Sequence, residues 1–247
     1  MLSLKSLSKR FGGVVAVDRV DLDIAAGEVH ALIGPNGAGK TTLIHQISGS
    51  LGCDSGEIRF LSKDVTRLAA HERVRAGLAR SYQITSIFRR FSVLDNLALA
   101  VQARSGTSFS FWKPLAVESA LFDEARAIAG QIGLSAKIDL PGASLAHGEQ
   151  RALEVGLALA TRPKLVLLDE PMAGMGPEES RRMIELIGRI RAMVTVLLVE
   201  HDMDAVFRLA DRISVMVNGR LIATGRPEQI RMNEEVRRAY LGDELAA

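Results

Sequence analysis

The residues best suited to chemistry in this sequence form a glycine-rich segment that also contains a lysine and two threonines. Segment 34–42 matches the phosphate-binding loop pattern G-x-x-x-x-G-K-[ST] without a gap. Its glycines let the backbone curl so that successive N–H groups face one anion, and the Lys40 ammonium adds a point charge. The Thr41 hydroxyl is a suitable ligand for Mg²⁺. The sequence therefore predicts that a nucleoside triphosphate contacts Gly34, Pro35, Asn36, Gly37, Ala38, Gly39, Lys40, Thr41 and Thr42.

The segments on either side of this loop have the character that the pattern requires. The apolar run 29–33 predicts a buried strand entering the loop, and 41–47 predicts a helix leaving it. A helix that starts at the loop adds the positive end of its dipole to the anion site. The alternative is a glycine-rich turn that matches by chance, and the strand–loop–helix context argues against it.

Two carboxylates follow a second apolar run. Asp169 and Glu170 come at the end of 165–168, which predicts a buried strand, where a charge is costly unless a cation or water meets it. Asp169 suits the Mg²⁺ side of the site, and Glu170 suits polarisation of an attacking water. The alternative makes both carboxylates solvated loop residues.

A histidine follows a third apolar run, 194–199. Since parallel strands end on the same edge of a sheet, we expect His201 to approach the phosphate that Lys40 holds. A lone histidine after a strand is more often structural. Here the same chain also contains the phosphate-binding loop and the two carboxylates, which favours a role for His201 in the site.

Composition and charge indicate one ordinary globular protein. The chain has 247 residues, 47% of them hydrophobic and 24% charged, with a formal net charge of +2. Basic residues are dispersed among acids, so no basic stripe indicates nucleic acid as a partner. The lone Cys53 excludes an internal disulfide, and the histidines lack the paired spacing of a zinc site. We expect no secretory signal and no membrane-spanning run, so that any membrane connection runs through a partner.

Periodicity predicts a β-rich start, a helical middle and a mixed α/β end. Short alternating runs at 14–17 and 20–24 predict antiparallel strands, and 84–150 has helical spacing of apolar residues at Leu121, Ala125, Ile128 and Ile132. Further expectations are a turn at 52–56, a strand at 57–61, a short helix at 71–76, and a hairpin of 213–217 and 221–223 turning at Asn218-Gly219.

These motifs in this order resemble the ATP-binding cassette (ABC) ATPases over nearly the whole chain. Segment 145–151 resembles the signature segment of that family, Tyr82-Gln83 its glutamine loop, and Glu200-His201 its switch histidine. Phe11, just ahead of Gly12-Gly13, resembles the aromatic residue that stacks on adenine. The resemblance implies an α/β fold, a P-loop NTPase cassette with a mainly parallel core sheet, an antiparallel β subdomain and a helical subdomain. In one domain, 1–247, the nucleotide-binding core with its β subdomain would take 1–83 and 151–247, and the helical subdomain with the signature 84–150.

The resemblance also implies partners and roles. Two subunits, identical or different, would enclose two ATP molecules head to tail, with Leu145, Ala146, His147, Gly148 and Glu149 of one subunit facing the nucleotide of the other. Lys40, Gln83, Glu170 and His201 would be catalytic, and Thr41, Gln83 and Asp169 would hold Mg²⁺. The chain would lie peripherally at the cytoplasmic face of the cell (inner) membrane, on permease subunits and indirectly with a solute-binding protein.

The predicted permease contact is the surface 83–91. The apolar side chains Ile84, Ile87, Phe88 and Phe91 beside Arg89 and Arg90 indicate an apolar patch with a polar rim. The alternative is a buried helix start.

Two residues depart from the family pattern. Ala146 stands where the signature has serine, which removes one hydroxyl donor, and Gly176 stands where the loop after Glu170 has an acid. Neither change touches Lys40 or His201, so the resemblance still implies an active ATPase.

Several segments resemble the ATPase subunits of branched-chain amino acid and amide importers, namely 9–13, 79–88, 146–150 and 238–242. A lipopolysaccharide-export ATPase is the nearest alternative, since 87–90 and the same ending also resemble it. Soluble ABC ATPases of DNA repair or the ribosome would carry a long coiled-coil insertion or two cassettes with a charged linker, and a regulator without turnover would have lost the lysine, glutamate or histidine.

Overall fold

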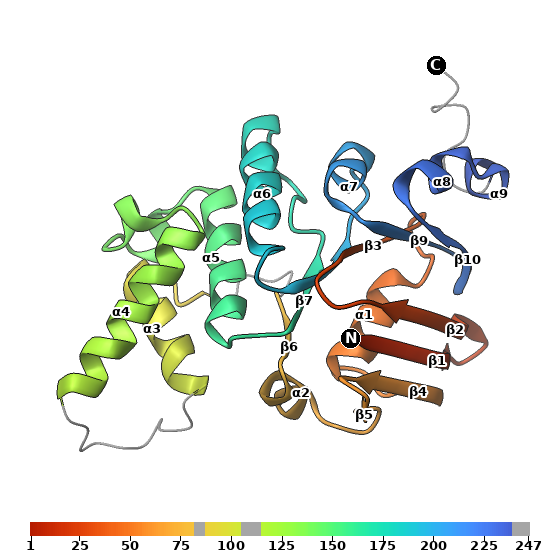
Figure 1. Ribbon diagram of the computed structural model, residues 1–247, viewed down its shortest axis with the longest axis horizontal. Helices are drawn as coiled ribbons and strands as arrows, with labels where there is room; N and C mark the ends of the chain where they lie inside the picture. Colours follow the sequence, from red (N-terminus) through yellow and green to blue (C-terminus); the bar gives the residue numbers. More distant parts are fainter. Residues whose placement is uncertain (82–86, 105–114, 239–247) are drawn as a thin grey trace. The chain divides into compact units, whose positions relative to one another are not determined.

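The structure is a computed structural model that describes residues 1–81, 87–104 and 115–238. It divides into two compact units. Unit 1 contains Met1–Arg73 and Thr195–Ala247, and unit 2 contains Val74–Val194. Figure 1 labels most helices and strands of both.

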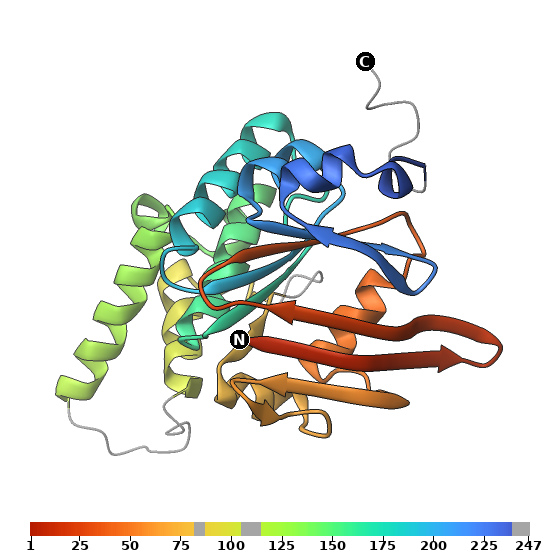
Figure 2. The ribbon, with the colours of Figure 1, turned by 45° about the vertical axis from the view of Figure 1, so that its right-hand side comes forward.

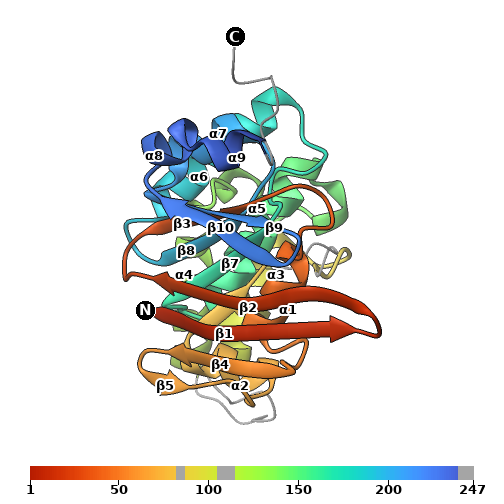
Figure 3. The same cartoon turned by 90° about the vertical axis from the view of Figure 1, so that its right-hand side faces the viewer.

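An antiparallel sheet in unit 1 is built from the first strands of the chain. Its order is β2-β1-β4-β5, with β1 (Leu2–Phe11), β2 (Val14–Ile24), β4 (Ser55–Phe60) and β5 (Lys63–Asp64), and Figure 3 shows these strands in that sequence. The β1–β2 hairpin, red in Figure 2, turns at Gly12-Gly13. The antiparallel prediction is confirmed. The strand expected at 57–61 begins earlier, within the predicted turn, and ends before Leu61, whose φ of 51° turns the chain.

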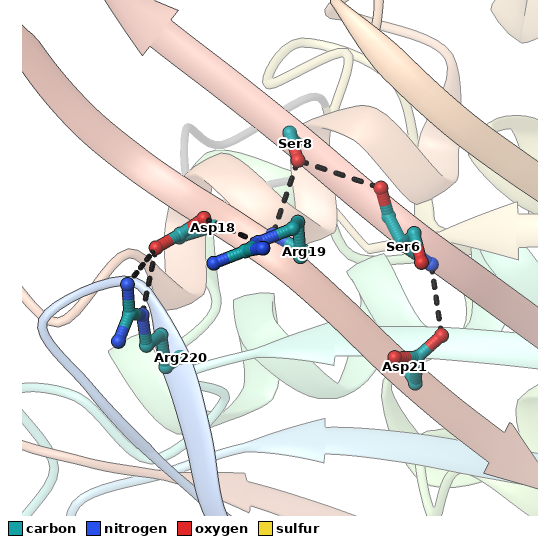
Figure 4. Close-up of polar contacts among 6 residues, drawn as sticks. All are labelled: Ser6, Ser8, Asp18, Arg19, Asp21 and Arg220. Carbon is teal, nitrogen blue, oxygen red and sulfur yellow. Dashed lines mark hydrogen bonds and ion pairs between the residues drawn. The ribbon is translucent and has the colours of Figure 1, made fainter.

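The two runs predicted as separate strands at 14–17 and 20–24 form the single strand β2, which corrects that expectation. The β1–β2 register shifts several times, and Ser6 and Arg19 have positive φ angles of 47° and 48°. Side chains satisfy the backbone at these irregularities (Figure 4): Arg19 N–H donates to Ser8 Oγ at 3.0 Å and Ser6 N–H to Asp21 Oδ1 at 2.8 Å. Because these N–H groups keep hydrogen-bond partners, β1 and β2 continue through their bulges instead of ending there.

A second group of strands in unit 1 has the order β10-β9-β3-β8. The strands are β3 (Val29–Ile33), β8 (Thr195–Val199), β9 (Arg212–Val217) and β10 (Arg220–Gly225). Strand β3 is parallel to both β8 and β9, while β10 returns antiparallel to β9. Asn218 and Gly219 both have positive φ, as the two-residue hairpin turn requires. Each of the four segments predicted as strands here, 29–33, 194–199, 213–217 and 221–223, coincides with one of these strands, so all four predictions are confirmed.

The helices of unit 1 complete its core. Three of them, α7 (Met203–Leu209), α8 (Pro227–Met232) and α9 (Glu234–Val236), contribute apolar side chains to a cluster with β3 and β9. The predicted helix after the loop is α1 (Lys40–Ser48), and the predicted helix at 71–76 is α2 (Ala70–Ala76).

A buried arginine of α2 binds the carboxyl end of α1. The Arg73 guanidinium is 2% exposed and donates to Gln46 O at 2.7 Å, Ile47 O at 2.8 Å and Thr66 O at 2.9 Å. A cation at the carboxyl end of a helix meets the negative end of the dipole and the last carbonyls. Arg73 therefore stabilises the helix that follows the phosphate-binding loop.

Unit 2 is helical with two parallel strands, β6 (Leu78–Arg80) and β7 (Leu165–Asp169). Its helices are α3 (Val93–Arg104), α4 (Leu115–Gln131), α5 (His147–Ala160) and α6 (Pro177–Ile190), with short 3-10 turns at η1 (Ser135–Lys137) and η2 (Gly142–Ser144). Ala125, Ile128 and Ile132 are buried as their spacing predicted. Arg104 of α3 donates to Glu124 of α4 at 2.7 Å and to Ala160 O of α5 at 2.9 Å, which joins the three helices.

Candidate nucleotide-binding site

The glycine-rich loop has the predicted setting between β3 and α1. A β-carbon at Gly34 would lie 2.0 Å from Met216 O, and one at Gly39 would lie 2.1 Å from Ala16 O. Both glycines also have φ angles in the left-handed region, 154° and 104°. Only glycine fits these two places, since the loop passes tightly between β9 and β2.

The lysine of the loop is turned back onto the loop itself. Lys40 is 7% exposed, and its Nζ donates to Gly34 O at 2.6 Å and to Pro35 O at 3.0 Å. The loop therefore curls around a positive charge. Asn36 and Gly37 are exposed, and so is Thr41 at the first turn of α1, while Ala38 is buried and Thr42 half-buried.

Phe11 lies at the end of β1 with 51% of its surface exposed. It pairs with Val14, two residues before the Ala16 carbonyl that contacts Gly39. The Lys9 ammonium lies 5.6 Å from the centre of the Phe11 ring, a cation–π contact. An exposed aromatic ring is thus placed on the strand pair that contacts the loop.

His201 follows β8, the parallel neighbour of β3, and is exposed. Leu32 of β3 pairs with Val199 of β8, so both strands deliver their following segments to the same sheet edge, as expected. His201 Nδ1 lies 3.8 Å from the buried Glu200 carboxylate, which also accepts the His201 N–H at 3.1 Å.

In unit 2, Asp169 ends β7 and is 3% exposed. The cation that a buried carboxylate needs is supplied by the protein: Arg80 Nη2 lies 2.9 Å from Asp169 Oδ2. Glu170 follows at a φ of 48°, a strained conformation for a residue other than glycine. Sequence reasoning missed Arg80, although a basic residue ending the short apolar run at 78–80 was a usable signal.

The signature segment lies at the start of α5. Ala146 is the N-cap with extended backbone, φ −61° and ψ 161°, and its N–H donates to Glu149 Oε2 at 3.1 Å. Burial raises the pKa of Glu149. The hydrogen bonds from Lys137 and from the Ala146 N–H outweigh this effect, so that the pKa lies below its usual value. Leu145 is buried, while Ala146 and His147 are exposed.

The predicted permease surface is only partly confirmed as exposed. Phe88 and Phe91 are 57% and 46% exposed and stack with ring centres 5.4 Å apart. Ile87 is 7% exposed, which corrects its assignment to the patch; its Cδ1 packs toward Gly142, where an added β-carbon would lie 3.2 Å away. The Asn96 side chain holds this loop, accepting from Phe88 N–H at 2.7 Å and donating to Phe91 O at 3.2 Å. Tyr82, Gln83, Ile84 and 239–242 lie outside the described residues.

A glycine-rich phosphate loop between a parallel strand and a helix, in an α/β protein with a second, antiparallel sheet, defines a P-loop ATPase cassette. Residues 17–173 match the family model described as ABC transporter, and residues 220–246 match that of the branched-chain amino acid ATP-binding cassette transporter. The chain belongs to the ABC transporter family and is an ATPase subunit of that family.

The similarity to relatives and to solved structures extends over nearly the whole chain. The high-affinity branched-chain amino acid transport ATP-binding protein LivG of Escherichia coli (strain K12) is 38% identical over 250 residues, 98% of each chain. The lipopolysaccharide export system ATP-binding protein LptB of the same organism is 35% identical over 245 residues, 99% of this chain and 98% of that protein. The ADP conformation of MJ1267, an ATP-binding cassette of an ABC transporter, is 31% identical with a TM-score of 0.86, covering 98% of each chain. Among the helices of the described ranges, none is both long and apolar enough to cross a membrane.

Proposed function

We propose that this ATPase energises the uptake of branched-chain amino acids or related amino acids and amides, as one of two cassette subunits beneath a permease. The observation that carries the substrate class is the match of residues 220–246 to the branched-chain family model, together with the similarity to LivG. The similarity to LptB keeps lipopolysaccharide export as the second candidate.

In this proposal the loop N–H groups and Lys40 hold the phosphates of ATP, and the exposed Phe11 ring stacks on adenine. Lys40 would exchange its contacts with Gly34 O and Pro35 O for phosphate oxygens, which are stronger acceptors for an ammonium. Glu170 would polarise the attacking water, with Gln83 and His201 near the γ-phosphate.

The proposed Mg²⁺ ligands are the hydroxyl of Thr41, the carboxylate of Asp169 and the amide of Gln83. This donor set fits, since it consists of oxygen atoms and contains a single carboxylate, and Mg²⁺ is bound through one or two carboxylates together with phosphate oxygens and water. Within the described residues, no group of three or more His, Cys, Asp or Glu side chains could hold a metal alone. When bound, Mg²⁺ neutralises phosphate charge. Arg80 Nη2, at 2.9 Å from Asp169 Oδ2, holds that side chain in place.

The permease would dock on the exposed pair Phe88 and Phe91 with the neighbouring Arg89 and Arg90. Stacked aromatic rings rimmed by arginines suit an apolar pocket with acidic or polar edges. Phe88→Ala should weaken co-purification with the permease while ATP affinity stays at the parental value. The matched control is Leu140→Ala, another exposed apolar side chain of unit 2.

The substrate class is tested by reconstituting this chain with candidate permease subunits. Proteoliposomes containing the complex, the solute-binding protein and ATP should accumulate radiolabelled leucine, isoleucine or valine. Complex formation with a permease that extracts lipopolysaccharide, and no amino acid uptake, would decide for the second candidate.

A further inference from the structure

One carboxylate in unit 2 connects the starts of two helices. Glu179 Oε1 accepts the N–H of Gly148, the second residue of α5, at 3.1 Å. Glu179 Oε2 accepts the N–H of Gly176, the N-cap of α6, at 3.4 Å. Glu179 itself is the third residue of α6, so the second contact is a common way to cap a helix, whereas the first reaches another helix.

The contact at Gly148 is close. A β-carbon added to Gly148 would lie 3.1 Å from both Cβ and Oε1 of Glu179. Any larger residue at position 148 would therefore push Glu179 within its own subunit. Gly148 is thus needed for the contact inside the subunit as well as for any approach from outside.

In the dimer that the resemblance to ABC ATPases implies, Gly148 faces the nucleotide bound by the second subunit, which brings its N–H toward the γ-phosphate. A single N–H at the positive end of a helix can donate one strong hydrogen bond, and two anions placed at that end repel each other. The Glu179 carboxylate is an anion already in this place, 3.1 Å from the nitrogen.

We propose that Glu179 is a positioning residue that holds the Gly148 N–H until the γ-phosphate of the facing subunit takes it. This inference rests on the proposed dimer. While Glu179 is bound, it keeps the signature segment and the loop ending at Gly176 in one arrangement, since its two oxygens contact both. ATP-driven dimerisation then competes with an internal anion and loosens both segments together.

The test uses the full-length chain with Glu170→Gln, in which hydrolysis does not disperse the dimer. Dimer dissociation constants are measured by sedimentation velocity in saturating ATP and Mg²⁺, and ATP affinity is measured at concentrations where the chain is monomeric. Glu179→Ala should tighten the ATP-dependent dimer about three- to tenfold, the size of one charge at a helix N-terminus. Glu179→Gln, which keeps an acceptor but loses the charge, should tighten it less.

The matched control is Glu178→Ala. Glu178 lies in the same first turn of α6, carries the same charge, pairs with Arg181 at 2.7 Å and has a side chain that is 58% exposed. Its removal should leave the dimer constant unchanged. Hydrogen exchange of the Gly148 amide should be faster in monomeric Glu179→Ala and unchanged in Glu178→Ala.

The outcomes separate the two hypotheses. If the Glu170→Gln parent dimerises with ATP and Glu179→Ala dimerises equally or more weakly, Glu179 is only a helix cap and the inference fails. If the parent shows no ATP-dependent dimer with or without its permease, the proposed dimer fails and the inference with it. Should Glu179→Ala not fold, the Glu179→Gln comparison decides alone.

Discussion

Arg80 and Asp169 form a buried ion pair across the parallel strands β6 and β7, with 2.9 Å between Nη2 and Oδ2 and side-chain exposures of 6% and 1%. Breaking such a pair leaves one charge buried without its partner. We expect Arg80→Met to lower the free energy of unfolding by about 3 kcal/mol. Asp169→Asn in the same chain should recover part of this loss, because it removes the orphaned charge.

Denaturant unfolding of the two single variants and the double variant measures this coupling. Arg75→Met, at an exposed position of α2, is the control for loss of a positive charge. Additive losses in the double variant would mean that the ion pair contributes nothing specific.

Glu170 combines strain with its proposed chemical role. A φ of 48° is unfavourable for a residue with a β-carbon and not for glycine. The free energy of unfolding of Glu170→Gly should therefore exceed that of Glu170→Ala by about 1 kcal/mol. Comparing these two variants cancels every contact of the lost carboxylate. Equal melting temperatures would contradict the strained conformation.

The same position should control turnover. Glu170→Gln should keep ATP affinity and lose hydrolysis by at least about 10²-fold, since an amide accepts no proton. Single-turnover hydrolysis measures the loss, and an unchanged rate would remove Glu170 from the proposed role.

Ala146 is an N-cap without a capping side chain. Ala146→Ser should therefore stabilise the monomer by about 1 kcal/mol, independently of any second subunit. In the Glu170→Gln background it should also raise ATP-driven dimerisation modestly by adding a donor. Ala143→Ser, exposed and outside the cap position, is the control for the hydroxyl alone. If Ala146→Ser raised dimerisation but left the stability of the monomer unchanged, the new hydroxyl would not bind the backbone of α5.

The cluster around Glu124 makes stability depend on pH. Arg104, and less strongly Arg162, hold the pKa of Glu124 below its usual value in the folded state. The folded chain therefore binds this proton less readily than the unfolded chain, and the stabilisation is full above the unfolded pKa of about 4.3 and is lost as the pH falls through the folded pKa.

The stability difference between the parent and Glu124→Gln should therefore shrink as the pH falls from about 6 to below about 4. Unfolding in urea at several pH values measures it. Asp123→Asn, which removes a 73% exposed carboxylate that pairs with its neighbour Arg126 along α4, should show a much smaller pH dependence.

Local pattern predicted much of the fold and several site positions. The strand before the loop, the helix after it, the strand ending at Asp169 and the hairpin at Asn218-Gly219 all lie where predicted. These features depend on the backbone preferences of neighbouring residues and on burial of a continuous apolar run, both of which are visible along the chain.

The errors have one physical origin. The runs 14–17 and 20–24 were expected as separate strands, but the Arg19 N–H between them donates to Ser8 Oγ of the neighbouring β1, so β2 continues through both. Ile87 was expected on the surface, yet it is buried in a loop that Asn96 organises from the next helix.

The residue types of the phosphate loop, of Asp169-Glu170 and of His201 determined the class of chemistry, because few side chains can meet phosphate, metal and water at the ends of buried strands. Only the tertiary structure decided which charges hold these groups in place. Arg80 contacts Asp169, 89 positions away in the sequence, and Glu179 contacts Gly148, 31 positions away. Such contacts depend on where separate elements come to lie once their apolar faces are buried, and no local spacing encodes that distance.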